Sequence, residues 1–140
     1  MSQISPTTPV LVGVAQFVER VTDPDYQVLS PVAITARAAQ EALNDVGNAK
    51  LSGLIDSVFA VRTFEDSTPM LAFPHGRSDN FPRSVCARLN IAPTRAVWAP
   101  SGGDSPQKLV AESCEAIARG ESCAALVCGG EAISTAAALL

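Results

Sequence analysis

Short apolar runs that alternate with Ser-Pro pairs constrain the folding of this chain more than any other feature. Runs of strand-like composition lie at Pro9–Gln16, Leu54–Thr63, Arg95–Ala99 and Cys123–Cys128. Continuous apolar runs of this length are typical of strands that are covered on both faces, and we expect Pro9–Gln16 to be such a strand. Strands alternating with helices predict an α/β domain with a mainly parallel sheet and helices on both faces.

Helices are predicted between these runs. Ser30-Pro31 opens the first, with serine as N-cap and proline at the first helical position, and Gly47 ends it. The predicted core face of this helix consists of apolar residues at helical spacing, namely Ile34, Ala38, Ala42, Leu43 and Val46. A shorter helix begins at Asn80, and Ser105-Pro106 opens a third helix that ends before Gly120.

A glycine turn, Pro100–Asp104, joins the third strand to the third helix. Ser105 is predicted as the N-cap of that helix, with Asp104 as an alternative that could share the capping role. Gly102 and Gly103 have two compatible interpretations, a turn that needs positive φ or close backbone approach, and a place where a ligand approaches the backbone. A nucleophilic Ser101 or Ser105 would need a neighbouring base, and the sequence identifies none.

Composition excludes several classes of function. Hydrophobic residues make up 47% of the chain and charged residues 17%, as in ordinary globular domains. The net charge is −4 and the ten basic residues are scattered, so we expect no nucleic-acid partner. No apolar stretch reaches the roughly 18 residues of a membrane helix, and no signal peptide is recognisable, so we expect a cytoplasmic protein.

The chemistry-bearing residues are few. Four cysteines form no CxxC pair and there is a single histidine, His75, so we expect no metal site. His75 is interpreted as an exposed loop residue, with a catalytic role as the less favoured alternative. Cys86 and Cys114 are interpreted as buried small apolar residues, and Cys128 as structural although it ends a strand. The apolar tail Glu131–Leu140 carries no stop signal and suggests truncation.

Three stretches together resemble the thiolase superfamily: Pro9–Gln16, Ala116–Gly120 and Ala124–Glu131. The resemblance implies that residues 1–140 are the N-terminal part of a thiolase-like fold, with the C-terminal thiolase domain absent. It also implies an acyl-CoA ligand, acyl transfer to or from coenzyme A or thiolytic cleavage, and a role in lipid metabolism. A homodimer through the third strand, with Trp98 at the interface, is a further implication.

The catalytic cysteine of thiolases does not carry over to this chain. Counting back from Gly120 places that position on Gly103, which has no side chain and cannot be a nucleophile. The same count places Glu131 on the family's glutamate, while the other catalytic groups lie in a C-terminal half that this chain lacks. The turn Gly-Gly-Asp-Ser-Pro-Gln at 102–107 is similar to a thiolase-like subgroup often called acetyl-CoA acetyltransferases.

The resulting hypothesis assigns ligand binding, and no catalytic residue, to the turn. Its candidate ligand-binding residues are Ser101, Gly102, Gly103, Asp104 and Ser105, because N–H groups at a helix N-terminus attract a phosphate or a thioester oxygen. We expect coenzyme A or acyl-CoA as a ligand and no covalently bound cofactor. We expect residues 1–140 by themselves to be inactive as an acyltransferase. The alternatives are a non-catalytic acyl-CoA-binding or scaffolding protein, and another doubly wound domain with an anion site at Ser101–Gln107.

Overall fold

A parallel sheet in the strand order β2-β1-β3 forms the centre of the fold. The computed structural model describes residues 3–68 and 74–140. The strands are β1 (Ile55–Val61), β2 (Arg95–Ala99) and β3 (Ala124–Cys128). In the central strand, Ala60 lies opposite Trp98 of β2 and opposite Cys128 of β3. The predicted parallel sheet is confirmed, and its three strands lie within one or two residues of the predicted bounds.

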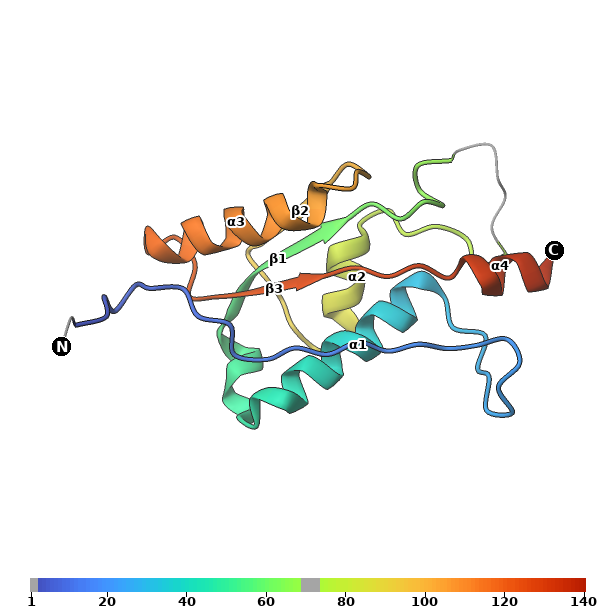
Figure 1. The fold of residues 1–140 in the computed structure, drawn as a ribbon, viewed down its shortest axis with the longest axis horizontal. Helices are drawn as coiled ribbons and strands as arrows, with labels where there is room; N and C mark the ends of the chain where they lie inside the picture. The colour runs from blue at the N-terminus through green and yellow to red at the C-terminus, as the bar shows by residue number, and fades with distance from the viewer. Residues whose placement is uncertain (1–2, 69–73) are drawn as a thin grey trace.

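Helices cover both faces of the sheet, as predicted. They are α1 (Pro31–Val46), the 3-10 helix η1 (Ala49–Leu54), α2 (Phe81–Arg88), α3 (Ser105–Ala118) and α4 (Ile133–Leu139). Figure 1 shows α3 on one side of the sheet and α1 with α2 on the other. The chain therefore folds as an α/β domain whose strand ends are open to solvent at the edge where ligands bind in such folds.

The predicted ends of α1 are confirmed in detail. Ser30 Oγ accepts a hydrogen bond from the Ala33 N–H at 3.2 Å, and Pro31 occupies the first turn. Gly47 closes the helix with φ of 68°, and its N–H donates to the Asn44 carbonyl at 3.0 Å. Both ends follow from local chemistry, because serine satisfies a free N–H and glycine adopts the left-handed conformation at little cost.

The core lies between β1 and α2. Val58, Phe59 and Ala60 of the central strand are fully buried, and Phe81 and Val85 of α2 are at most 1% exposed. Burying a large apolar side chain stabilises a fold by about 1.5–3 kcal/mol. Asn80 positions α2 for this packing, since its side chain accepts a hydrogen bond from the Arg83 N–H at 3.2 Å. The predicted start of this helix is confirmed.

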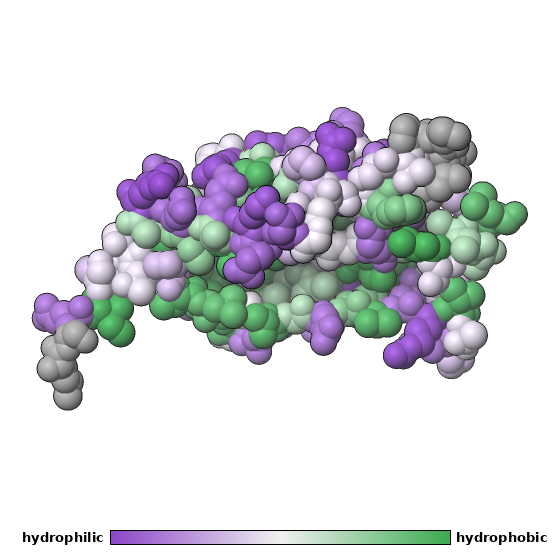
Figure 2. Space-filling view, turned by 45° about the horizontal axis from the view of Figure 1, so that its top comes forward, coloured by the Kyte–Doolittle hydropathy of each residue, from purple (hydrophilic) through white to green (hydrophobic). Residues whose placement is uncertain are grey.

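The expected strand at Pro9–Gln16 is wrong. The segment is irregular, and Val10, Leu11 and Val14 are 70%, 84% and 59% exposed. A strand needs a neighbouring backbone to bond with, and in the described part of the chain β3 does not pair with this segment. An apolar groove of about 490 Å³ lies between Pro9–Ala15 and β3, and Figure 2 shows exposed apolar residues along this side of the molecule.

The packing of α1 also differs from the prediction. Its most deeply buried residues include Thr35, Ala36 and Ala39 rather than the predicted apolar face. The predicted residues are half-buried, and Ala38 and Ala42 line the groove. Ala36 and Ala39 belong to the core cluster, against which Leu43 also packs, whereas Ile34 and Val46 lie beside residues 13–17 of the N-terminal segment.

The last ten residues form more structure than the sequence indicated. Residues from Ile133 to Leu139 form α4, with Thr135 and Ala136 buried. An alanine-rich segment has a high helix propensity, so a helix here is consistent with its composition. The helix begins directly after the turn that carries Glu131, which brings this glutamate to the carboxyl end of β3.

Candidate functional site

The predicted connection from the third strand through the glycine turn to the third helix is present. We call this segment, Val97–Leu109, the elbow. β2 ends at Ala99, the turn follows, and α3 begins at Ser105. Ser101 to Asp104 are exposed, and the Ser105 N–H donates to the Gly102 carbonyl at 3.1 Å. The structure therefore brings all five predicted ligand-binding residues together at the N-terminus of a 14-residue helix. Whether they bind a ligand stays a prediction.

Ser105 is not the N-cap that the sequence predicted. Asp104 occupies the cap position, without a side-chain capping bond, and Ser105 is the first helical residue. The Ser105 hydroxyl instead donates to the Pro100 carbonyl at 2.9 Å and closes the turn. The prediction failed because either of two consecutive polar residues can cap a helix, and backbone geometry chose the earlier one.

Asp104 forms a surface ion pair. Its carboxylate lies 2.6 Å from Lys108 Nζ, one helical turn further on. The hydrogen bond from Lys108 holds the pKa of Asp104 below its usual range. The carboxylate is therefore ionised and partly neutralised by the lysine. Few N–H groups remain free at this helix N-terminus, because the Ser105 N–H donates to the Gly102 carbonyl and Pro106 has no N–H.

The two glycines of the turn differ from each other. Neither has a positive φ, so the left-handed interpretation is wrong for both. A Cβ at Gly102 would lie 3.0 Å from Ser105 Oγ, whereas a Cβ at Gly103 would meet nothing within 4 Å. Gly103 is therefore open where a side chain would lie, and the fold does not require glycine there.

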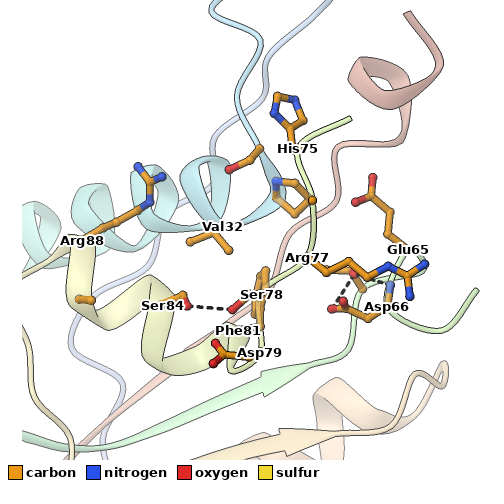
Figure 3. Close-up of a pocket in the computed structure, with 15 residues that line it drawn as sticks. Val32, Glu65, Asp66, His75, Arg77, Ser78, Asp79, Phe81, Ser84 and Arg88 are labelled. Atoms are coloured by element: carbon orange, nitrogen blue, oxygen red, sulfur yellow. Dashed lines mark hydrogen bonds between the residues drawn. The ribbon is translucent and has the colours of Figure 1, made fainter. Parts of the chain in front are cut away.

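A second candidate site, which sequence reasoning missed, lies at the carboxyl ends of β1 and β3. It is a cavity of about 500 Å³. Figure 3 shows the start of α1, the loop after β1, the loop before α2 and α2 itself around it. The residues of the cavity used below are Val32, Glu65, Asp66, His75, Arg77 and Phe81. The sequence signal was the density of charged residues in the irregular segment 64–79.

A hydrogen bond between the loop after β1 and the turn after β3 positions the acidic end of this cavity. Glu131 Oε1 accepts from the Phe64 N–H at 2.7 Å. Thr63 Oγ1 donates to the Asp66 carboxylate at 2.9 Å and accepts from the Asp66 N–H at 3.0 Å. The turn is thereby fixed with Glu65 at its centre, and Glu65 is only 4% exposed.

Burial and neighbouring charge act together on these carboxyl groups. Burial raises the pKa of Glu65, and the charges of Glu131 and Asp66 raise it further, while Arg77 opposes them. Burial also raises the pKa of Glu131, against the hydrogen bond from Phe64 that lowers it. Carboxyl groups whose pKa is raised in a cavity are typical of acid–base or ligand-binding sites.

The cysteines do not supply a nucleophile near either site. Burial raises the pKa of Cys86 to about 11 and that of Cys128 to about 12, so both are neutral thiols at physiological pH. This supports the structural interpretation of Cys86 and Cys128. Cys114 is half-buried on α3, beside the groove, rather than fully buried as predicted. His75 is exposed and lies at the border of the cavity.

The outer strand β2 carries Trp98 at an edge of the sheet. The Arg62 guanidinium lies 4.6 Å from the centre of its ring. The buried Trp98 Nε1 has no hydrogen-bond partner within the described residues. An edge strand is a place where another chain can pair, and the homodimer through this strand stays a prediction.

Among residues 3–68 and 74–140, no group of three or more His, Cys, Asp or Glu side chains is placed to hold a metal ion. Within the same residues, no helix has the length and apolar character required to cross a bilayer.

Comparison with known proteins identifies the fold. No protein-family model and no curated protein matches the chain. A solved structure does match, the monomeric SCP2-thiolase like protein type 1 from Mycobacterium smegmatis. It is 35% identical, with a TM-score of 0.73 over 94% of this chain, and the chain spans 25% of that protein. The fold is thiolase-like, as the sequence resemblance predicted.

Proposed function

We propose that this chain supplies the acyl-CoA-binding elbow of a thiolase-like protein and that no residue of the elbow forms a covalent acyl intermediate. The observation that carries the proposal is Gly103. It lies in the turn between β2 and α3, separated from the helix by Asp104, and has no side chain to attack a thioester. The Ser105 N–H already donates to the Gly102 carbonyl and Pro106 has no N–H, so an anionic or carbonyl oxygen would bind the N–H groups of Gly103 and Gln107.

The chemistry of the other thiols supports a non-covalent role. Thiolates rather than thiols attack thioesters, and burial keeps the Cys86 and Cys128 thiols protonated. The similarity to an SCP2-thiolase like protein supports the choice of an acyl-CoA ligand over other anions. A cytoplasmic location and a place in lipid metabolism are part of the proposal.

A titration with coenzyme A tests the proposal. We expect the amide resonances of residues 101–105, 107 and 108 of the isotope-labelled chain to shift on addition of coenzyme A. Gly103→Ala is expected to bind like the wild type, because the position is open. Gly103→Asp adds a negative charge at the same open position and is expected to weaken binding at least about fivefold, or roughly 1 kcal/mol. Equal binding by the two variants would contradict an anion site at the turn.

Mass spectrometry tests the absence of a covalent step. After incubation with acetyl-CoA, we expect no acetyl adduct on any cysteine or serine of the purified chain, and no thiolysis of acetoacetyl-CoA. A stoichiometric adduct at Ser101 or Ser105 would overturn the non-covalent proposal. Gly103→Cys serves as the positive control, since it restores a thiol at the elbow.

A second candidate function is acyl transfer in which this chain supplies acid–base groups. The observation that favours it is the raised pKa of Glu131, the residue matched to the family's glutamate. This role requires a nucleophile or an acceptor from outside residues 1–140. If Glu131→Gln lowers the acyltransferase activity of a longer protein while coenzyme A binding at the elbow is unchanged, this candidate gains over the first.

A further inference from the structure

The cavity at the carboxyl end of β1 contains one buried carboxyl group that has no partner among the described residues. Asp66 receives a hydrogen bond from Thr63, and Glu131 receives one from the Phe64 N–H. Glu65 follows Thr63 and adjoins Asp66, and it is 4% exposed. Its backbone carbonyl accepts a hydrogen bond from the Thr68 N–H at 3.2 Å, but within the described residues its carboxyl group forms no hydrogen bond and no ion pair. Figure 3 shows its carboxyl group turned away from Asp66 and toward the start of α1.

An ionised carboxylate is costly in this position. It would lose its hydration without gaining a donor, and two carboxylates stand close to it. The charged groups that border or adjoin the cavity are Asp66, His75, Arg77, Asp79, Arg88 and Glu131. Among those that act on Glu65, the two acidic neighbours and burial oppose its ionisation, and Arg77 alone favours it.

A protonated carboxyl group brings an O–H that itself needs an acceptor. The Glu65 carboxyl group has no hydrogen-bond partner within the described residues, and it borders the cavity of about 500 Å³. Val32 and Phe81 border the same cavity and add apolar surface. An acceptor that fits such a site is an uncharged carbonyl oxygen attached to a small, partly apolar molecule.

We propose that this cavity binds an uncharged carbonyl compound, a thioester or an amide, whose oxygen accepts a hydrogen bond from the protonated Glu65 carboxyl group. The site shares no residue with the elbow, so the inference does not depend on coenzyme A binding there. A cation is the poorer ligand, because the Arg77 guanidinium already lies at the acidic end of the cavity (Figure 3). Glu65 is thus a ligand-binding residue rather than part of a charged site.

Binding of S-acetyl-N-acetylcysteamine, a small thioester without phosphate groups, tests the proposal. The probe is titrated into the isotope-labelled chain, and the shifts of the Phe64, Asp66 and Arg77 amides give the dissociation constant. We expect binding at low pH and its loss as pH rises through the folded-state pKa of Glu65, which lies above the usual glutamate range. Binding that strengthens with rising pH would overturn the proposal and indicate a cation site.

Matched variants separate a hydrogen-bond donor from a structural role. Glu65→Gln keeps a donor without a titratable proton, and we expect it to bind the probe with a flat pH profile. Glu65→Leu keeps similar bulk without a donor, and we expect at least about tenfold weaker binding, or roughly 1.4 kcal/mol. If the Glu65→Leu variant binds the probe as tightly as the Glu65→Gln variant, the carboxyl group is not the donor and the proposal fails.

Two controls make the result unambiguous. His75→Gln is expected to leave the pH dependence of probe binding unchanged, because His75 lies at the rim of the cavity. Loss of this pH dependence in His75→Gln would assign the effect to His75 and overturn the proposal. The carbon-13 shift of the Glu65 carboxyl group is expected to titrate above the usual range. If Glu65→Leu unfolds, the shift titration still decides, since a carboxyl group that titrates in or below the usual range contradicts the proposal.

Discussion

The Phe64 N–H donates a hydrogen bond to Glu131 Oε1 at 2.7 Å and so joins the carboxyl ends of β1 and β3 across 67 positions of sequence. This contact fixes the turn that carries Glu65 over the cavity. It also gives Glu131 a structural role that does not depend on its correspondence to a catalytic glutamate. Its consequences are measurable.

Removing the acceptor at position 131 is expected to loosen the turn after β1. Glu131→Ala should lower the free energy of unfolding by roughly 1 kcal/mol, because one charge-assisted hydrogen bond at a partly exposed site is lost. Glu131→Gln keeps an oxygen acceptor and should lose less than half as much. Urea unfolding measures the stability of both variants, and hydrogen exchange of the Phe64 amide should accelerate in Glu131→Ala but not in Glu131→Gln. Equal stability of Glu131→Ala and the wild type would contradict this role.

Asp56 is expected to make the fold sensitive to acid. Its carboxylate accepts hydrogen bonds from Ser122 Oγ, from the Cys123 N–H at 2.7 Å and from Ser57 Oγ at 3.0 Å. Burial alone would raise the pKa of Asp56, but these hydrogen bonds lower it below its usual range. The unfolded state therefore takes up the proton first, so this contribution to stability is present above the usual aspartate pKa and is lost as pH falls through the folded-state value.

Asp56→Ala measures that contribution. We expect a loss of about 1–2 kcal/mol near neutral pH, discounted because the carboxylate is partly exposed to solvent. The difference between variant and wild type should shrink as pH falls below about 4. Glu121→Ala, an exposed acidic residue close in sequence to the same partners, serves as the control and should show little effect. A difference that stays constant with pH would show that the carboxylate charge contributes nothing.

Gly103→Cys is expected to create a reactive thiol. The position is open and its φ is not positive, so the side chain enters without strain. A thiolate at the N-terminus of α3 is favoured by the helix N–H groups, and its pKa should fall below the usual value of about 8.5. Gly53→Cys, also open but in the short helix η1, is the control.

The pH dependence of alkylation measures the effect. We expect the thiol at 103 to react at lower pH than the thiol at 53, with the background from Cys123 and Cys114 subtracted from wild-type protein. If both new thiols titrate alike, the elbow exerts no effect on a group at this position, and the proposed anion site would lose support.

Gly13→Ala is expected to separate the N-terminal segment from α1. A Cβ at Gly13 would lie 2.4 Å from the Ala42 carbonyl oxygen and 2.6 Å from Val46 Cγ2. Since one of these atoms is backbone, the segment must move, at a cost of about 1–3 kcal/mol. Loss of the hydrogen bond from the Val14 N–H to Asp45, followed by amide exchange, reports the movement. Protection of Val14 in the variant equal to that in wild type would show that the contact adapts without cost.

The sequence alone was sufficient wherever the chemistry is local. Ser30, Pro31 and Gly47 define α1 because each acts on its own turn, and the apolar run at Ile55–Val61 forms the buried central strand. The elbow after β2 also followed from neighbouring residues. Its cap did not, because Asp104 and Ser105 compete and only the backbone path separates them.

Tertiary structure decided the features that depend on distant partners. Pro9–Gln16 has the composition of a buried strand, yet it remains irregular, because within the described residues it lies across a groove from the edge strand β3 and forms no ladder with it. In the sequence alone, Glu65 is one of several charged residues in a polar loop. Its burial and its raised pKa arise only when β1 and β3 bring Glu131 beside it, since burial and charge proximity are properties of the folded chain.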